Sequence, residues 1–213
     1  GRRYIIETMS AGLALFDYDR DGAVDIHFLN GAELPGVRYD TPPQDALYRN
    51  QGAGTFRDVT EHAGVGDTGF GLGVTVGDYD NDGHPDLFLN NAGPNVLYRN
   101  NGDGTFSDVT ARAGVVGGDK VGAGACFLDM DGDGDLDLYV ANYVQLAFDA
   151  HKSLVLSGVP TYPGPLDYLP EADQLYRNNG DGTFTDVSVE AGVADRAATG
   201  MGMTCLDYDA EGD

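Results

Sequence analysis

The sequence predicts an all-β fold, a partial β-propeller of about three and a half four-stranded blades within 213 residues. Three observations predict it. Two motifs alternate along the chain, short runs of β-forming residues flank them, and no stretch shows a sustained helical period. A repeat of about 50 residues that supplies four short strands has the size of a propeller blade. A β-sandwich or a β-solenoid with fortuitous repeats is the alternative.

The first motif is acidic and occurs four times. Its copies read FDYDRDGAVDIHFLN (16–30), GDYDNDGHPDLFLN (77–90), LDMDGDGDLDLYVAN (128–142) and LDYDAEGD (206–213). An apolar run precedes every copy and another follows each complete one, which predicts two strands joined by an acidic loop. A Gly lies five residues before the first Asp each time. Small residues there would let the innermost strands of neighbouring blades approach closely.

The second motif predicts a hairpin. Its copies read LYRNQGAGTFRDVTEHAGV (47–65), LYRNNGDGTFSDVTARAGV (97–115) and LYRNNGDGTFTDVSVEAGV (175–193). A Gly-rich turn separates LYRN from the next β-like run, and the end of each copy has room for one helical turn at most. We interpret NNGDG as a turn rather than a second metal site, because the first copy lacks its Asp. The recurring Arg49, Arg99 and Arg177 are expected to pair with loop or hairpin carboxylates.

The repeats divide the chain into blades. We expect blades at 9–66, 67–117 and 118–195, the last with an insertion at 143–173, and the start of another at 196–213. A propeller needs at least four blades to close, so we expect this chain to be a fragment of a larger propeller.

The acidic loops have the spacing of metal sites. Counted from the first Asp, carboxylates stand at positions 1, 3, 5 and 9, and Gly at position 6 permits a sharp bend. Position 7 would contribute its backbone carbonyl. The predicted ligands are Asp17, Asp19, Asp21, Ala23 and Asp25; Asp78, Asp80, Asp82, His84 and Asp86; Asp129, Asp131, Asp133, Asp135 and Asp137; and Asp207, Asp209, Glu211 and Asp213.

Calcium is the ion that this ligand set predicts. Two carboxylates about 5 Å apart repel by roughly 3 kcal/mol at an effective dielectric near 20, so an empty ordered loop is costly. Ca²⁺ accepts six to eight oxygens in flexible geometry, whereas Mg²⁺ prefers to keep its waters and is the second choice. Zinc would need recurring His or Cys. An EF-hand would need Glu at position 12, where these loops have apolar residues. Solvated acidic turns without metal are the alternative.

Composition excludes several partners. The net charge of −23 repels nucleic acid and anionic membranes, and no apolar run approaches the length of a membrane span. The chain holds two cysteines, Cys126 and Cys205, in otherwise apolar segments of two repeats. We expect buried free thiols there in preference to a disulfide.

These motifs resemble the FG-GAP or VCBS repeats, the calcium-binding blades of integrin α-subunit propellers. LYRNNGDGTFxDVT with AGV, together with ETMSAGLALFDYD (7–19) and TYPGPLDYLPEADQLYRNNGDGTF (161–184), is more closely similar to proteins of the cartilage acidic protein type, which carry an ASPIC/UnbV domain. Glu211 and Ala53 depart from the pattern. The resemblance implies a propeller of about seven blades in a secreted, periplasmic or cell-surface protein.

No catalytic motif accompanies the loops. The four His residues neither recur nor cluster, and the paired carboxylates fit metal loops better than acid–base catalysis. We therefore expect no enzyme, but a calcium-binding module for extracellular binding or adhesion. A purely structural scaffold and the body of a secreted hydrolase or lyase are the alternatives. The segments 31–46 and 143–173 interrupt the β pattern, and either they bind an extracellular protein or glycan or they are covering loops.

Overall fold

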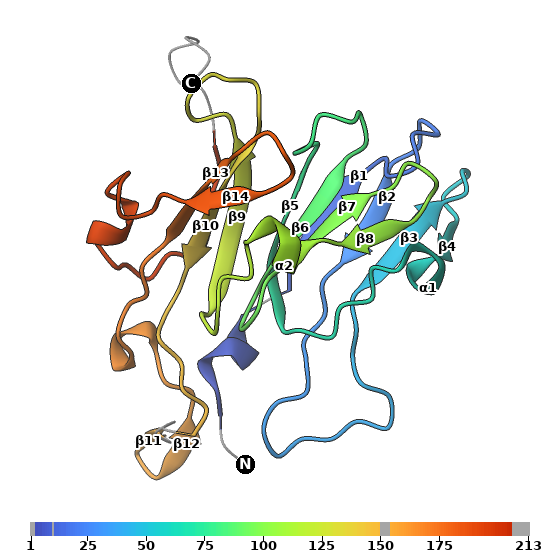
Figure 1. Ribbon diagram of the computed structural model, residues 1–213. Coiled ribbons are helices and arrows are strands. Elements are labelled where there is room, and N and C mark those ends of the chain that lie inside the picture. The colour runs from blue at the N-terminus through green and yellow to red at the C-terminus, as the bar shows by residue number, and fades with distance from the viewer. Residues whose placement is uncertain (1–2, 10, 150–153, 206–213) are drawn as a thin grey trace.

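The described residues form three four-stranded antiparallel sheets and one two-stranded hairpin (Figure 1). The structure is a computed structural model that describes residues 3–9, 11–149 and 154–205. Each four-stranded sheet holds one copy of both motifs, which confirms the all-β fold and the partial β-propeller. The fourth acidic copy, at 206–213, lies outside the described residues.

The strands of each blade pair in a simple order. Blade 1 contains β1 (Leu13–Phe16), β2 (Asp25–Phe28), β3 (Ala46–Asn50) and β4 (Phe56–Asp58). Blade 2 contains β5 (Gly71–Gly77), β6 (Asp86–Asn91), β7 (Val96–Asn100) and β8 (Phe106–Asp108). Blade 3 contains β9 (Gly122–Leu128), β10 (Asp137–Asn142), β13 (Gln174–Asn178) and β14 (Phe184–Asp186). The insertion in blade 3 adds the hairpin of β11 (Leu154–Leu156) and β12 (Val159–Thr161).

Helices are confined to single turns, as the sequence predicts. The α-helices are α1 (Thr60–Ala63) and α2 (Thr110–Ala113), each closed by a left-handed Gly. The 3₁₀ helices are η1 (Ile5–Thr8), η2 (Pro165–Asp167) and η3 (Val193–Asp195). The Gly-rich segments form the β3–β4, β7–β8 and β13–β14 hairpins, which confirms the turn interpretation.

Strand register places every acidic loop at the same point of its blade. In each blade the residue before the first Asp pairs across the sheet with the Asp at position 9 of the loop. The three pairs are Phe16 with Asp25, Gly77 with Asp86, and Leu128 with Asp137. The first two strands therefore close the loop like the base of a hairpin, and all three loops lie at one end of the blades.

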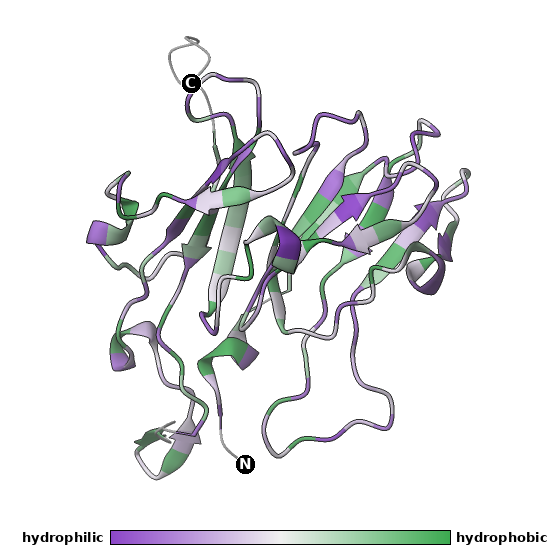
Figure 2. Cartoon of the chain, viewed as in Figure 1, coloured by the Kyte–Doolittle hydropathy of each residue, from purple (hydrophilic) through white to green (hydrophobic). Residues whose placement is uncertain are grey.

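The core lies between blades rather than within one sheet. One buried cluster joins side chains of blades 1 and 2, including Leu47 and Leu89, and another joins blades 2 and 3. Apolar residues accordingly concentrate on the inner strands in Figure 2, while the outermost strands carry more hydrophilic residues. Tyr18, in the acidic loop of blade 1, stacks on Phe106 of blade 2 with ring centroids 6.1 Å apart. Tyr79 of the acidic loop in blade 2 makes the equivalent contact with Phe184 of blade 3, with ring centroids 5.6 Å apart, so these two loops each pack against the next blade.

The innermost strands approach one another backbone to backbone. A Cβ atom placed on Gly73 of β5 would lie 2.1 Å from the carbonyl oxygen of Ala123 in β9. This contact confirms the expected role for Gly73. At the equivalent Gly124 of blade 3, the nearest contacts of a Cβ would lie at 3.3 Å.

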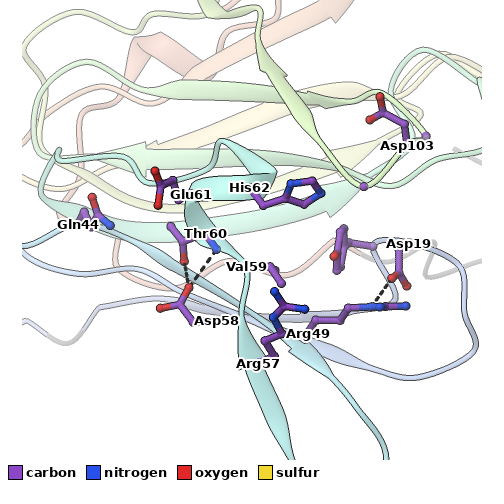
Figure 3. A pocket seen from close by; sticks show the side chains of 13 residues that line it. Asp19, Gln44, Arg49, Arg57, Asp58, Val59, Thr60, Glu61, His62 and Asp103 are labelled. Atoms are coloured by element: carbon purple, nitrogen blue, oxygen red, sulfur yellow. Dashed lines mark hydrogen bonds and ion pairs between the residues drawn. The ribbon is translucent and has the colours of Figure 1, made fainter.

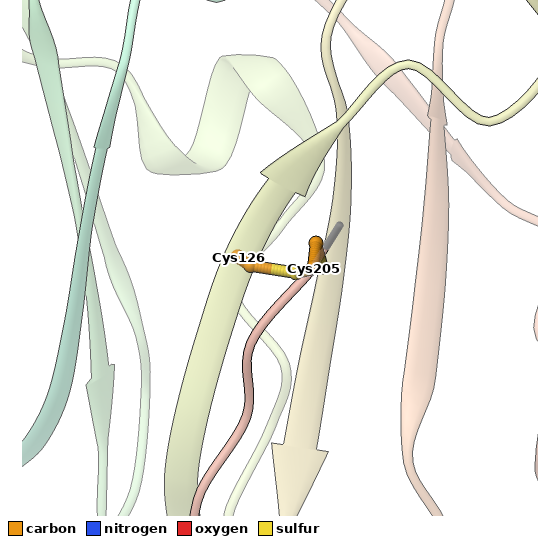
Figure 4. Close-up of a disulfide and its surroundings, with 2 residues drawn as sticks. All are labelled: Cys126 and Cys205. Carbon is orange, nitrogen blue, oxygen red and sulfur yellow. A yellow bond between two sulfur atoms is a disulfide. The ribbon is translucent and has the colours of Figure 1, made fainter. Parts of the chain in front are cut away.

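The cysteines form a disulfide, so the expectation of free thiols was wrong (Figure 4). Cys126 lies on β9, and Cys205 lies in the segment that runs beside it, with a Cα–Cα distance of 6.5 Å. The physical reason is the repeat itself. Equivalent segments of successive repeats become neighbours, which brings two sulfur atoms that are 79 residues apart in sequence within bonding range.

The N-terminal segment and the insertion pack together at the end of the blades opposite the acidic loops (Figure 1). Ile5, Ile6 and Tyr143 are buried in a third cluster with the inner strands of blades 2 and 3, and Phe148 and Tyr168 pack against it. These aromatic side chains therefore pack against this cluster. The β11–β12 hairpin instead exposes apolar side chains, namely Leu154, Val155, Leu156 and Val159.

Asp45 gives a prediction about pH. Its side chain is completely buried, Oδ1 accepts a hydrogen bond from the Asn30 N–H, and Oδ2 has no partner among the described residues. Burial raises the pKa of Asp45 from 3.8 to about 7. The folded chain then binds this proton more tightly than the unfolded chain, so stability falls as pH rises from about 4 to 7. The upper limit of this loss is about 4 kcal/mol.

We expect the variant Asp45→Asn to remove this loss, because Asn95 stands at the same place in blade 2 and accepts the same backbone bond. Denaturant unfolding at pH 5 and pH 8 measures it. The difference between the variant and the wild type should grow in favour of the variant as pH rises. Asp173→Asn, at the equivalent place in blade 3, is the matched control, because Tyr139 already donates to its second oxygen. An equal gain from both variants would contradict a burial effect.

Candidate metal centre

The Asp at position 9 anchors each loop. Asp25 and Asp86 are completely buried and Asp137 is 2% exposed. In loop 1, Oδ2 of Asp25 accepts the Tyr18 N–H at 3.1 Å and Oδ1 accepts the Asn50 N–H at 2.7 Å. The other two loops repeat both bonds. Position 9 therefore ties its own loop to the strand that ends in LYRN.

The Asp at position 1 folds the loop back on itself. Oδ1 of Asp17 accepts the N–H of Asp21, and Oδ2 accepts the N–H of Gly22 at 2.8 Å. Loops 2 and 3 make the same pair of bonds. Gly22 has a φ of 88°, a left-handed conformation that explains why Gly recurs at position 6.

Positions 1, 3 and 9 converge. In each loop one carboxylate oxygen from each of these residues lies within 4.8 Å of the others, which is a spacing that one metal ion can bridge. The converging sets are Asp17, Asp19 and Asp25; Asp78, Asp80 and Asp86; and Asp129, Asp131 and Asp137. Among the described residues these are the groups of acidic, His or Cys side chains placed to hold an ion.

Positions 5 and 7 lie outside these converging sets. Oδ1 of Asp21 accepts the N–H of Ala23, and Asp82 and Asp133 likewise bind the N–H of position 7. Their ligation stays a prediction. The side chains at position 7 turn elsewhere. A Cβ on Gly102 would meet the His84 ring, and Asp135 accepts a hydrogen bond from Asn81 of the preceding loop. A backbone role for position 7 is consistent with these directions.

The LYRN arginines pair with the loops as expected, in two of three blades. Nε of Arg49 lies 2.6 Å from Oδ2 of Asp19, and Nη2 of Arg49 lies 3.0 Å from Oδ2 of Asp21. Arg99 binds Asp80 and Asp82 in the same way. In the part of the chain that the structure describes, Arg177 makes no ion pair. Each pairing arginine compensates one of the four negative charges in its loop and leaves the rest uncompensated.

Two observations test whether the loops fit a cation. Burial, more than any neighbouring charge, raises the pKa of Asp86 to about 7 and also raises the pKa of Asp25 and Asp137. The remaining oxygen of Asp80, Oδ1, is buried and accepts no hydrogen bond from any described residue. A buried anionic oxygen without a donor is costly, and a metal ion is a partner that removes this cost. The residues therefore fit a hard divalent cation.

The fourth predicted ligand set, Asp207, Asp209, Glu211 and Asp213, lies outside the described residues, as does His151. Of the remaining histidines, His27 is completely buried and burial lowers its pKa to about 4. It occupies the place of Phe88 in blade 2, which indicates a core position rather than a ligand.

An open groove separates the outer part of blade 1 from the hairpin turn of blade 2 (Figure 3). Asp19, Arg57, His62 and Asp103 are among its lining residues. Asp58, also in the groove, accepts hydrogen bonds from the N–H and the hydroxyl of Thr60, which holds the start of α1. The groove is thus lined by mixed charges, of which Asp19 pairs with Arg49 and Asp58 binds Thr60.

Sequence reasoning missed the asparagine that ends each LYRN motif. Asn50, Asn100 and Asn178 donate their backbone N–H groups to the Asp at position 9 of their own blade, and the Nδ2 of each donates to the carbonyl oxygen of position 8. The available signal was that Asn stands at this place in all three copies. Buried polar side chains form hydrogen bonds, so a polar residue that recurs at the end of a strand indicates a specific bond.

No helix within the described ranges has the length and apolar character that crossing a bilayer requires. No curated protein matches the chain. Residues 17–89 and 78–140 match the FG-GAP-like repeat. Each match begins at the first Asp of one acidic loop and ends in the strand after the next, and together they span more than half of the chain. The chain belongs to the FG-GAP-like repeat family.

Proposed function

We propose that this chain is a calcium-binding propeller module that acts outside the cytoplasm, without catalysis, in binding or adhesion. Its acidic loops would hold Ca²⁺ at positions 1, 3 and 9, with further oxygens from positions 5 and 7 and from water. The ion would neutralise the loop carboxylates and fix the ends of the first two strands of each blade.

The observation that carries the calcium assignment is the buried oxygen Oδ1 of Asp80, which accepts no hydrogen bond from any described residue. One carboxylate oxygen each of Asp78, Asp80 and Asp86 also lies within 4.8 Å of the other two. Oxygen-only ligation by carboxylates suits calcium, and the loops offer neither His nor Cys in the converging sets. Weak calcium sites of this kind are filled in extracellular fluids, where calcium is millimolar.

The disulfide between Cys126 and Cys205 supports an oxidising compartment, since disulfides persist in secreted, periplasmic and surface proteins. FG-GAP repeats are typically extracellular or surface domains, which agrees with a secreted, periplasmic or surface location. We also propose that the chain is related to the cartilage acidic protein group, on the basis of the motifs described above. An extracellular protein or glycan would contact the segments 31–46 and 143–173.

Calorimetric titration of the metal-free chain with calcium tests the assignment. We expect at least three bound ions, with dissociation constants of about 10⁻⁴ to 10⁻³ M. Asp80→Asn should remove one ion from the stoichiometry. Asp103→Asn, which makes the same change of charge in the exposed hairpin turn of the same blade, should leave it unchanged. No heat in the wild type, or an equal loss from both variants, would overturn the assignment.

A further inference from the structure

Two asparagines connect neighbouring acidic loops. Nδ2 of Asn100, at the end of β7 in blade 2, donates to the carbonyl oxygen of Tyr18 in loop 1 at 2.9 Å. The backbone N–H of the same residue donates to Oδ1 of Asp86 in loop 2 at 2.7 Å. Asn100 is completely buried, so neither bond competes with water. One residue thus contacts a ligand of its own loop and the backbone of the preceding loop.

Asn178 repeats the arrangement one blade further on. Its Nδ2 donates to the carbonyl oxygen of Tyr79 in loop 2 at 2.8 Å, and its N–H donates to Oδ1 of Asp137 in loop 3 at 2.8 Å. Asn178 is 4% exposed. Each carbonyl that receives such a bond belongs to position 2, the residue directly before the ligand at position 3. We call Asn100 and Asn178 the linking asparagines.

We infer that the linking asparagines couple calcium binding in successive loops, so that an ion in one loop raises the affinity of the next. This inference rests on the proposed calcium function. The linking asparagines are positioning residues, because they act on the ligands through hydrogen bonds and would not contact an ion themselves.

Ordering of the chain gives the coupling its sign. An ion in loop 1 would fix Asp19 and with it the Tyr18–Asp19 peptide, which presents the Tyr18 carbonyl to Asn100. A fixed Asn100 holds its N–H toward Asp86, so part of the ordering that loop 2 requires is complete before its ion arrives. Binding to an already ordered loop is tighter, and linkage makes the effect equal in both directions.

Electrostatics oppose this coupling. An ion in loop 1 reduces the negative potential that attracts a second ion, which lowers the affinity of loop 2. Salt screens that term over a distance of about 8 Å at physiological ionic strength, while a buried hydrogen bond is hardly affected. The positive coupling should therefore become clearer as the salt concentration rises, which separates the two causes.

Loops 1 and 2 are the pair to test. Loops 2 and 3 are also joined by Asn81, whose side chain donates to the Gly134 carbonyl and to Asp135, so removal of Asn178 alone leaves a second connection. Blade 1 supplies the matched control. Within its own blade, Asn50 makes the same hydrogen bonds as Asn100. It donates to Asp25 and to the carbonyl oxygen of position 8, and it accepts a bond from the hairpin turn. Among the described residues it makes no bond to another blade.

The experiment follows hydrogen exchange of the peptide covering residues 78–86 in the full chain during a calcium titration at 0.15 M salt. Loop 1 is inactivated by Asp17→Asn with Asp19→Asn. We expect inactivation to raise the calcium concentration for half-protection of loop 2 by about fivefold. In the Asn100→Ala background, inactivation of loop 1 should shift the calcium concentration for half-protection of loop 2 by less than about twofold. In the Asn50→Ala background the fivefold shift should remain.

A second measurement needs no change at Asn100. In the variant with loop 1 inactivated, filling loop 2 with calcium should still slow exchange of residues 17–25, although loop 1 holds no ion. Two results would overturn this inference and leave the calcium assignment standing. One is calcium protection of loop 2 that does not change when loop 1 is inactivated. The other is a shift in the calcium concentration for half-protection that persists in Asn100→Ala. No protection of any loop would overturn both.

Discussion

Calcium should raise the stability of the metal-free chain by about 8 kcal/mol when each of the three described loops is filled at a hundred times its dissociation constant, because each such site contributes about 2.7 kcal/mol. For a chain of this length the corresponding rise in Tm is roughly 15 to 30 °C. The physical cause is the removal of repulsion among carboxylates that the fold holds within 4.8 Å of one another. Thermal unfolding in calcium and in EGTA measures the difference.

A single variant distinguishes metal binding from ordinary hydrogen bonding. Oδ2 of Asp80 accepts a hydrogen bond from Arg99, while Oδ1 accepts none from the part of the chain that the structure describes. Asp80→Asn therefore keeps an acceptor for Arg99 and removes one negative charge. We expect this variant to be at least as stable as the wild type in EGTA and less stable in calcium. Magnesium should give a smaller increase than calcium. Equal Tm values with and without calcium, or a loss in both conditions, would contradict the metal role.

The sequence was sufficient to predict the features that recur from one repeat to the next. The acidic loops, the hairpin turns and the pairing of Arg49 and Arg99 with loop carboxylates all follow from residues at fixed spacing, and local chemistry determines each of them. The convergence of positions 1, 3 and 9 also follows, because register places position 9 opposite the residue before position 1.

Contacts between repeats were harder to predict. The bond from Asn100 to Tyr18 joins residues 82 positions apart, and the disulfide joins residues 79 apart. Both depend on which strands become neighbours, and that is known only once the blades are placed side by side. The β11–β12 hairpin was missed for a different reason. Its Ser157-Gly158 turn, with both φ values positive, is a local signal that lay inside a segment interpreted as irregular.

The largest effect expected from a single substitution is at Gly73, on the innermost strand of blade 2. A Cβ there would lie 2.1 Å from the Ala123 carbonyl oxygen, with other backbone atoms of β9 at 3.0 and 3.1 Å. Backbone in a paired strand cannot move aside as a side chain can, so blades 2 and 3 would have to separate. We expect Gly73→Ala to cost at least about 3 kcal/mol, measured by denaturant unfolding in saturating calcium.

Gly124 is the matched control, because it occupies the same place in blade 3. A Cβ on Gly124 would have its nearest contacts at 3.3 Å, with Met203, so Gly124→Ala should cost less than about 1 kcal/mol. The comparison separates close approach from the general effect of replacing a strand Gly by Ala, which both variants share and which by itself favours Ala. The Gly73→Ala variant should also affect calcium binding. Gly73 allows blades 2 and 3 to approach closely, and Asn178 connects the acidic loops of these same two blades. Gly73→Ala should therefore weaken calcium protection of loops 2 and 3 more than that of loop 1, which is affected only through its coupling to loop 2. An equal loss across all three loops would mean that the variant acts by global unfolding instead.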